Sequence, residues 1–410
     1  MPNEKLTQLR RMAEKELFGN ILPFWMNRVI DLESGGFYGV IKADGTPDKT
    51  ADKNLILNAR LVWTFAAAWR MFKKPEYLEY ARRAYNYFTA HFIDREHGGC
   101  YYEVDCKGSP ATDYKLTYGQ SFAIYGLTEY ARATGDMSAL DEALAISALL
   151  EEHVRDFENG GYFEICARDW TLDSVNQYTP VNKHPGSVKT MNTHLHLLEA
   201  HTSLLRVHDD AQTRGLVAEF LSIMEDKVLN RSINHYGLYF DAEWKSLTSE
   251  VSFGHDIEGS WLMREAALEL GDTAPLKRTE EICSKIAAAC LAESVMPDGS
   301  MIYEYDTATG EYARRRTWWV QNEAVVGFLN AWEMTGDEKF LDASAACFEY
   351  SDKYLVDHHD GEWFMLIGED GCTPVPGKVK VDGWKCPYHN SRMCFEIIER
   401  AEKALNDKKD

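Results

Sequence analysis

Much of the chain places apolar residues three or four positions apart, the spacing at which residues share one face of an α-helix. These stretches come in pairs, such as NLILNARLVWTFAAAWRMF followed by PEYLEYARRAYNYFTAHF, and YGQSFAIYGLTEYARAT followed by a run from Met137 to Val154. Two later pairs begin at DIEGSWLMREAALEL and at VQNEAVVGFLNAWEMT. A Gly-Asp step often separates the two members of a pair, which is typical of a helix end followed by a helix N-cap. The pattern predicts a mostly helical protein.

Short segments with turn residues and alternating aromatic residues stand between the helix pairs. SGGFYGVIKADG and HGGCYYEVDCKG are examples, and each predicts a β-hairpin. The last glycine before the strand recurs at intervals of 63, 62, 76, 62 and 62 residues. This regularity indicates six internal repeats, with an insertion of about 14 residues in the third. The repeated glycines are Gly36, Gly99, Gly161, Gly237, Gly299 and Gly361.

Six helix pairs predict an all-α fold, an (α/α)6 barrel of six helix-pair repeats with short β-hairpins at one end. Inner helices would surround a central cavity, and outer helices would cover them. The N-terminal segment MPNEKLTQLRRMAEKEL is helical in pattern and would complete the last pair, which closes the ring. An open solenoid is the alternative. We expect residues 1–410 to form a single barrel domain.

Composition limits the partners of the protein. Lys+Arg of 44 against Asp+Glu of 65 gives a net charge of −21, which argues against nucleic-acid and anionic-membrane partners. We find no signal-peptide core and no run of about 18 apolar residues, the length of a membrane span. The nine cysteines form no CxxC motif, so we expect reduced cysteines and a cytoplasmic protein. A monomer or weak homodimer is expected.

The stretch TMNTHLHLLEAH, residues 190–201, contains three histidines in a predicted helix. His194 and His201 share a mostly apolar face, so we interpret them as hydrogen-bonded core histidines. His196 points the other way, toward the side of Asn192 and Glu199. No two of the histidines have the four-residue spacing of a helical zinc pair, so this stretch does not predict a metal site.

Polar and aromatic residues recur near the start of each predicted inner helix, counted from the repeat glycine. Such residues would converge in the mouth of the barrel, as in a small-molecule site. Because neighbours on a helix point about 100° apart, we expect Trp319 rather than Trp318 to line the cavity. Arg60 lies in an apolar pattern and needs a carboxylate or a substrate oxygen as partner. The residues that share this phase are Arg60, Tyr118 with Gln120, His196, His255 with Glu258, Trp319 with Glu323, and His389.

Four segments, MNTHLHLLEAH, SFGHDIEGSWL, WWVQNEAVVGF and WKCPYHNSRMC, resemble the motifs of the cellobiose 2-epimerase family, within the N-acylglucosamine 2-epimerase superfamily. The resemblance runs along almost the whole chain. It implies an (α/α)6 barrel without organic cofactor or metal, which epimerises the reducing-end glucose or mannose of β-1,4-linked disaccharides at C2. It implies a small-molecule carbohydrate as the partner. The segment 171–189 is the least similar part and is expected near the site, where it would affect substrate range.

The resemblance also implies roles for individual residues. His255 and His389 match the acid/base histidines of the family. The further catalytic residues that it implies are His196, Arg60 and Glu258, and the substrate-binding residues are Tyr118, Asn192, Trp319, Glu323 and Trp384. Trp318, next to Trp319, is a further candidate for substrate binding.

The chemistry of C2 inversion explains this set of residues. The sugar ring must open, a base must remove the C2 proton to give an enediolate, and a proton must return on the other face. Two histidines suit this reaction because their ordinary pKa lies near working pH. Arg60, with Asn192 and His196, would stabilise the enediolate, and Glu258 would orient His255.

Three alternative functions remain open at this point. One is a monosaccharide 2-epimerase or aldose–ketose isomerase of the same superfamily, acting on mannose, glucose or N-acetylglucosamine. Another is a glycoside hydrolase that uses Glu258 and Glu323 as its carboxylate pair. The third is a sugar-binding protein without catalytic activity.

Overall fold

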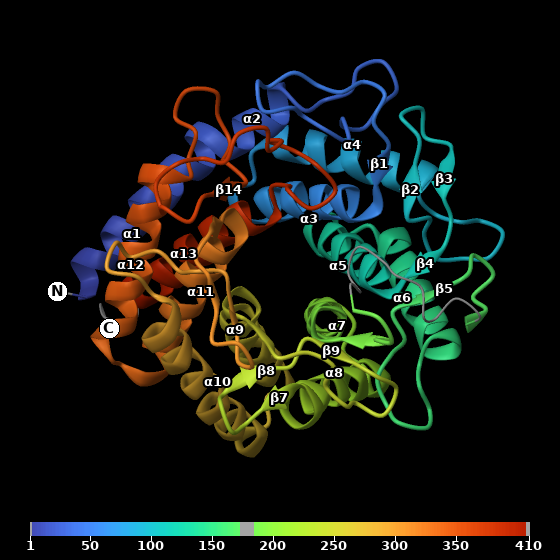
Figure 1. The fold of residues 1–410 in the computed structure, drawn as a ribbon. Coiled ribbons are helices and arrows are strands. Elements are labelled where there is room, and N and C mark those ends of the chain that lie inside the picture. Colours follow the sequence, from blue (N-terminus) through green and yellow to red (C-terminus); the bar gives the residue numbers. More distant parts are fainter. Residues whose placement is uncertain (1, 173–183, 407–410) are drawn as a thin grey trace.

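The computed structural model describes residues 2–172 and 184–406. Within these residues, paired helices form a ring of two layers around a central axis (Figure 1). The inner layer consists of α3 (Leu55–Phe72), α5 (Thr117–Thr134), α7 (Met191–Leu205), α9 (Phe253–Leu270), α11 (Trp318–Thr335) and α13 (Tyr388–Asn406). The outer layer consists of α1 (Pro2–Glu16), α4 (Pro75–His91), α6 (Met137–His153), α8 (Ala211–Ile223), α10 (Thr273–Ser294) and α12 (Glu338–Tyr354).

The ring is closed. Each inner helix packs against the next, and α13 contacts both α11 and α3. The N-terminal helix α1 packs against α13 and α12, so the two ends of the chain lie on the same side of the ring (Figure 1). A π-helical turn (Leu17–Ile21) joins α1 to α2 (Leu22–Asn27), and a second one (Met224–Val228) follows α8. The predicted (α/α)6 barrel is therefore confirmed, and the open solenoid is wrong.

Burial separates the two layers. In α3 every residue from Leu55 to Ala68 is buried, as expected for a helix surrounded by others. The outer helix α4 buries one stripe that includes Tyr77, Ala81 and Phe88, and turns its charged residues outward. In the part of the chain that the structure describes, no helix is long and apolar enough to cross a membrane.

Gly-Asp steps join inner to outer helices, as the sequence predicted. Gly135, Gly271 and Gly336 end α5, α9 and α11 with φ values of 78°, 78° and 69°, a conformation that favours glycine. The side chains of Asp136 and Asp337 then accept backbone N–H groups at the start of α6 and α12. These joints reverse the chain within one or two residues.

The predicted hairpins are only part of the strand pairing. Single bridges such as Ile93 to Cys100 close most of the glycine turns. The hairpins β2–β3 and β11–β12 form within one repeat, and β7 pairs with β8. The strands are β1 (Lys53–Asn54), β2 (Glu103–Val104), β3 (Pro110–Thr112), β4 (Lys115–Leu116), β5 (Ile165–Cys166), β6 (Lys189–Thr190), β7 (Leu229–Asn230), β8 (His235–Tyr236), β9 (Tyr239–Phe240), β10 (Glu250–Ser252), β11 (Glu304–Asp306), β12 (Tyr312–Ala313), β13 (Arg316–Thr317) and β14 (Leu366–Ile367).

Most pairings join neighbouring repeats. The strand before each of five inner helices pairs with a strand of the following repeat, in the pairs β1–β2, β4–β5, β6–β9, β10–β11 and β13–β14. A bridge from Ile41 to Val381 makes the same connection between the first and last repeats. The strands thus link the repeats around the barrel end at which the inner helices begin.

A buried ion pair recurs below these strands. In four repeats a lysine just before the inner helix contacts an aspartate just after an outer helix, at distances of 2.5–2.9 Å. In three of them the lysine also donates to a carbonyl of the glycine turn. Each lysine therefore holds the turn against the start of an inner helix. The pairs are Lys53–Asp31, Lys115–Asp94, Lys189–Asp156 and Lys380–Asp357.

Lys53→Met tests the contribution of these pairs. The change leaves the Asp31 carboxylate and the Gly35 carbonyl without their buried partner, so we expect the free energy of unfolding to fall by about 3–5 kcal/mol. The control is Lys49→Met, which removes an ion pair to Glu33 whose side chains are 55% and 67% exposed. It should shift the midpoint of denaturant unfolding far less than Lys53→Met does. Equal effects of the two changes would contradict a structural role for the buried pair.

Candidate active site

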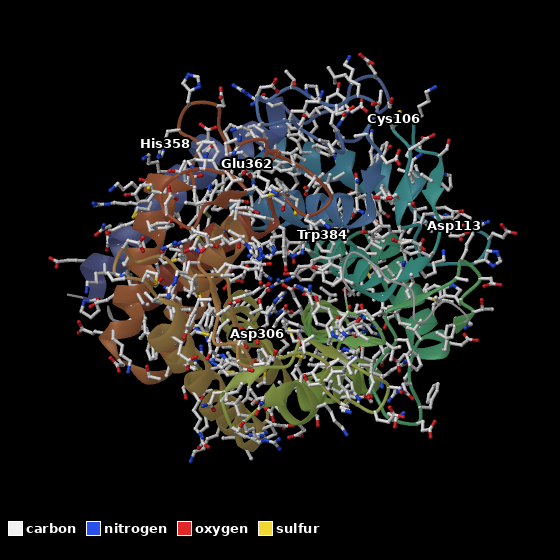
Figure 2. The ribbon with its side chains drawn as sticks, in the orientation of Figure 1. Cys106, Asp113, Asp306, His358, Glu362 and Trp384 are labelled. Atoms are coloured by element: carbon white, nitrogen blue, oxygen red, sulfur yellow. The ribbon has the colours of Figure 1, made fainter. Side chains whose placement is uncertain are left out.

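A cavity of about 810 Å³ opens at the barrel end where the inner helices begin. All six inner helices or the segments just before them contribute to its wall. Figure 2 shows side chains filling much of the space that the ribbon leaves open, with Trp384 beside the centre. Of the eleven predicted site residues, ten line this cavity: Arg60, Tyr118, Asn192, His196, His255, Glu258, Trp318, Trp319, Trp384 and His389.

Position along the helix decides which residues face the cavity. In α3, α5, α7, α9 and α11 the sixth residue of the helix lies on the side of the barrel axis. These residues are, in that order, Arg60, Phe122, His196, Glu258 and Glu323. Whereas the fourth residue of α3, Asn58, donates to the carbonyl of its own N-cap residue, the fourth residue of α5, α7, α9 and α11 points away from the axis and binds the backbone of a neighbouring turn. Gln120 is such a residue, because its amide accepts from the Cys100 N–H at 2.9 Å and donates to the Cys100 carbonyl at 2.9 Å. The expectation that Gln120 lines the mouth of the barrel is therefore wrong.

The fourth residue has the same task in other repeats. Gln321 binds both backbone groups of Met301, and Asp256 accepts from the Tyr236 N–H. His194 accepts from the Tyr162 N–H through Nε2 at 2.9 Å, while its Nδ1 lies 2.7 Å from the Thr190 carbonyl. We refer to this position as the turn-binding position. The interpretation of His194 as a hydrogen-bonded core residue is confirmed.

The other two histidines of the opening stretch differ in the same way. His201 is a core residue, with Nδ1 at 2.8 Å from the Leu197 carbonyl and Nε2 at 2.9 Å from the Ser147 hydroxyl. His196 lies at the cavity, with Nδ1 at 2.8 Å from Glu199, the partner on its predicted face.

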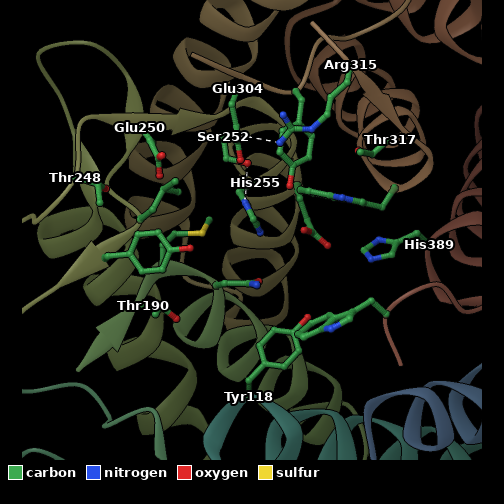
Figure 3. A pocket seen from close by; sticks show the side chains of 18 of the residues that line it. Tyr118, Thr190, Thr248, Glu250, Ser252, His255, Glu304, Arg315, Thr317 and His389 are labelled. Atoms are coloured by element: carbon green, nitrogen blue, oxygen red, sulfur yellow. Dashed lines mark hydrogen bonds and ion pairs between the residues drawn. The ribbon is translucent and has the colours of Figure 1, made fainter. Parts of the chain in front are cut away.

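Three cavity histidines are each held through Nδ1. Besides His196, His255 is held by the Ser252 hydroxyl at 2.8 Å and His389 by the Glu323 carboxylate at 2.7 Å. This leaves Nε2 as the nitrogen that each ring offers to a ligand. The Trp319 ring lies 4.8 Å from the His255 ring and 5.8 Å from the His389 ring, between centroids. Figure 3 shows the side chains of His255, near the middle of the drawn residues, and His389, at the right, apart from each other in the pocket.

Two predicted roles need correction. Glu258 does not orient His255, because Ser252, the N-cap residue of α9, contacts Nδ1 instead. Glu323, predicted to bind substrate, does not line the cavity, because it is buried behind His389 and accepts from the Trp261 indole N–H at 3.0 Å. Residues three positions before and after His255 can both reach its ring, so spacing alone did not separate Ser252 from Glu258.

The arginine beneath the cavity was missed by the sequence analysis. Arg392 Nη2 donates to Glu258 and to Glu323, each at 2.7 Å, and Nη1 contacts Glu199 and the Tyr388 hydroxyl. All of these side chains are buried. Unlike Arg60, Arg392 lies in the partly polar stretch YHNSRMC, so the local pattern did not show that its side chain would be buried.

Arg60 has only neutral partners among the contacts that the structure describes. Its guanidinium lies between the rings of Phe122 and Tyr388, at 4.2 Å and 4.6 Å from their centroids. Nη2 donates to the Tyr118 hydroxyl at 3.0 Å, and Nη1 approaches the Trp384 carbonyl at 3.4 Å. Because no carboxylate neutralises it there, the positive charge remains available to an anion in the cavity.

Burial determines the protonation of the site. It lowers the pKa of His255 to about 3, and burial with the charges of Arg60 and Arg392 holds the pKa of His389 well below its usual range. Both imidazoles are thus neutral near pH 7 and able to accept a proton. Burial opposes ionisation of Glu199, but Arg392, His196 and the Tyr388 hydroxyl together outweigh burial and bring the pKa of Glu199 to about 2. Burial, then the charge of Glu323, raises the pKa of Glu258 to about 8.

Aromatic residues form much of the remaining wall. Trp318 and Trp319 both line the cavity, so the expectation that only one of them would do so is wrong. Several buried polar atoms of cavity-lining residues have no hydrogen-bond partner in the described structure. They are Asn192 Oδ1, Thr248 Oγ1, Thr317 Oγ1, Trp318 Nε1 and Arg60 Nε. Each of these atoms is free to form a hydrogen bond with water or with a ligand in the cavity.

Glu258, Glu323 and His389 bring potential donor atoms within 4.8 Å of one another. The Arg392 guanidinium already donates to both carboxylates and supplies the positive charge at this point. The cluster therefore fits an ion-pair network and does not fit a metal. Of the segment predicted to affect substrate range, residues 173–183 lie outside the described residues, and His184 lines the cavity.

Comparison with known proteins agrees with the fold. The protein is a carbohydrate epimerase, an enzyme of the isomerase class. The family model of N-acylglucosamine 2-epimerase matches residues 36–390, and the chain belongs to this family.

Individual relatives cover nearly the whole chain. A cellobiose 2-epimerase of Bacteroides fragilis is 42% identical over 390 residues, which are 95% of this chain and 98% of the relative. The solved structure of a cellobiose 2-epimerase from Bacillus thermoamylovorans has a TM-score of 0.91 at 38% identity, covering 96% of this chain and 100% of that one. A D-mannose isomerase shares the fold, with a TM-score of 0.82 at 19% identity, covering 96% and 98% of the two chains.

The turn-binding position predicts how His194 tolerates change. His194→Gln introduces the residue that does this task in α5 and α11, so we expect the melting temperature to change little. His194→Ala leaves the buried Tyr162 N–H without an acceptor and should cost about 1–3 kcal/mol. Thermal unfolding followed by circular dichroism compares the two variants. Equal losses in both would show that histidine itself is required.

Proposed function

We propose that the protein epimerises, at C2, the reducing-end glucose or mannose of β-1,4-linked disaccharides such as cellobiose, mannobiose and lactose. One observation carries the proposal. His255 and His389, both neutral and both anchored through Nδ1, flank Trp319 and offer Nε2 to the same cavity. Inversion at C2 needs a group on each face. The neutral imidazole on one face accepts the C2 proton, and the imidazole on the opposite face delivers a proton that it has first taken up from solvent.

Proton removal from C2 requires an aldehyde at C1, so the ring opens first and an enediolate follows. The negative charge of the enediolate falls on sugar oxygens. Arg60 supplies an unneutralised positive charge, and Asn192 and His196 supply hydrogen bonds. We propose that the reaction needs no cofactor, since these groups account for each proton and charge.

The cavity supports a disaccharide. Its volume of about 810 Å³ exceeds the needs of one sugar ring, and its outer wall adds polar residues such as Thr248, Glu250 and Arg315. Trp319 and Trp384 offer ring faces on which sugars can stack. The names of the relatives in Bacteroides fragilis and Bacillus thermoamylovorans support cellobiose as a substrate.

The carboxylates argue against a hydrolase. A glycosidase places its two carboxyl groups on either side of the scissile bond. Glu258 and Glu323 instead share one nitrogen of Arg392, and Glu323 does not line the cavity. The histidines would also have no task in hydrolysis.

Proton NMR of the protein with cellobiose in D2O and EDTA tests the function. We expect a new reducing-end mannose signal with deuterium at C2, since the enediolate takes its proton from groups that exchange with solvent. Free glucose would establish hydrolysis instead. Deuterium at C2 of free mannose or glucose, with none in cellobiose, would move the substrate to a monosaccharide. Loss of activity on EDTA addition would contradict a metal-independent reaction.

The two-base mechanism predicts that His255→Ala and His389→Ala each lower turnover by at least about 100-fold while the circular dichroism spectrum stays unchanged. The reason is that each variant lacks the base on one face of C2. His194→Gln is the matched control, because it alters a histidine of a neighbouring inner helix that does not face the cavity. Near wild-type epimerisation by either alanine variant would exclude that histidine as a base.

A further inference from the structure

More carboxylates than cations meet beneath the cavity. Glu199, Glu258 and Glu323 all contact Arg392. Arg60 is a second buried cation at the same cavity, and its charge acts on His196 and His389 beside these carboxylates. The five side chains are at most 5% exposed. Since the cavity histidines are neutral, two positive and three negative charges would leave one net negative charge in a buried site. One carboxyl group can remove this charge by keeping its proton.

Hydrogen bonds distinguish the three carboxyl groups. Glu323 accepts from the Trp261 indole and from Arg392, and it also contacts His389. Glu199 contacts Arg392, the Tyr388 hydroxyl and His196. Glu258 has Arg392 alone among the described contacts. Because donors stabilise the ionised form, Glu258 is the group that keeps the proton.

We propose that Glu258 is a neutral carboxylic acid near pH 7 and donates a hydrogen bond to an oxygen of the reducing-end sugar. This inference rests on the proposed function. Glu258 lines the cavity from the same helix as His255, so it faces the sugar that His255 would deprotonate. A neutral acid can donate to a developing oxyanion, whereas an ionised carboxylate would repel it.

The inference predicts a pH dependence. The pKa of Glu258 lies at about 8, raised by burial and next by Glu323, so the neutral form dominates below that pH and disappears above it. A donor role therefore predicts that kcat/KM falls as pH rises through this value.

Besides Glu323 on α11, the charged and titratable groups around Glu258 are Arg60 on α3, Tyr118 on α5, His196 and Glu199 on α7, His255 on α9, and Tyr388, His389 and Arg392 on α13.

Glu258→Gln separates a neutral donor from an ionised carboxylate. Its amide oxygen can accept from Arg392 and its NH2 can donate to the sugar at any pH. We expect kcat/KM within about tenfold of wild type and loss of the decline near pH 8, whereas Glu258→Ala should lose at least about 100-fold. A glutamine variant as inactive as the alanine variant would overturn the inference, and so would full activity of both.

Infrared spectroscopy tests the proton directly. The difference between the wild-type and Glu258→Gln spectra at pH 7 should contain the carbonyl absorption of a buried protonated carboxyl group. Buried carboxyl groups such as Glu16 and Glu164, whose pKa burial raises to about 7, absorb in both proteins and cancel in the difference. The difference between wild type and Glu250→Gln, a change at an exposed residue of the same cavity, should lack the band. A wild-type minus Glu258→Gln difference without the band would contradict the inference. Because this readout needs no turnover, it decides the protonation even if the wild-type protein fails to exchange C2 of cellobiose.

Discussion

The guanidinium of Arg392 is the interaction on which the site depends. It belongs to α13 and contacts carboxylates of α7, α9 and α11, so four of the six inner helices meet at one buried cation. Two of those carboxylates in turn hold His196 and His389. The position of the cavity histidines is therefore coupled to the charge balance of the barrel interior. Removing one member would leave buried charges without partners, which is far more costly than losing one surface ion pair.

The sequence predicted the fold well because the repeat is expressed in local signals. Glycine turns, Gly-Asp helix joints and apolar periodicity depend on neighbouring residues, and six copies reinforce one another. The strand pairing was predicted less well for the opposite reason. β1 and β2 are about 50 residues apart and two residues long, so no local pattern shows that they pair. The connection between repeats follows from the closed ring rather than from either segment.

The sequence predicted well which residues come together at the site. It predicted less reliably which partner each of these residues contacts. Residues two positions apart on a helix point in almost opposite directions, so a small error in phase moves a side chain from the cavity to the turn. Gln120 shows this, since it shares the helix start with Tyr118 and yet binds the Cys100 backbone. The partner of His255 could not be chosen by spacing, because Ser252 and Glu258 are equally distant along the chain. Arg392 required knowledge of three other helices.

Comparison of equivalent positions separates stability from chemistry within one helix. At the turn-binding position glutamine, histidine and aspartate do the same task, because any side-chain acceptor at that point satisfies the backbone N–H of the turn. Two residues further on, the repeats diverge into arginine, phenylalanine, histidine and glutamate, and these side chains face one shared space or the cation beneath it. A symmetric scaffold thus supports an asymmetric site. A reaction at one carbon requires this asymmetry. The two faces of C2 need different bases, and the negative charge of the enediolate lies only on its oxygen atoms.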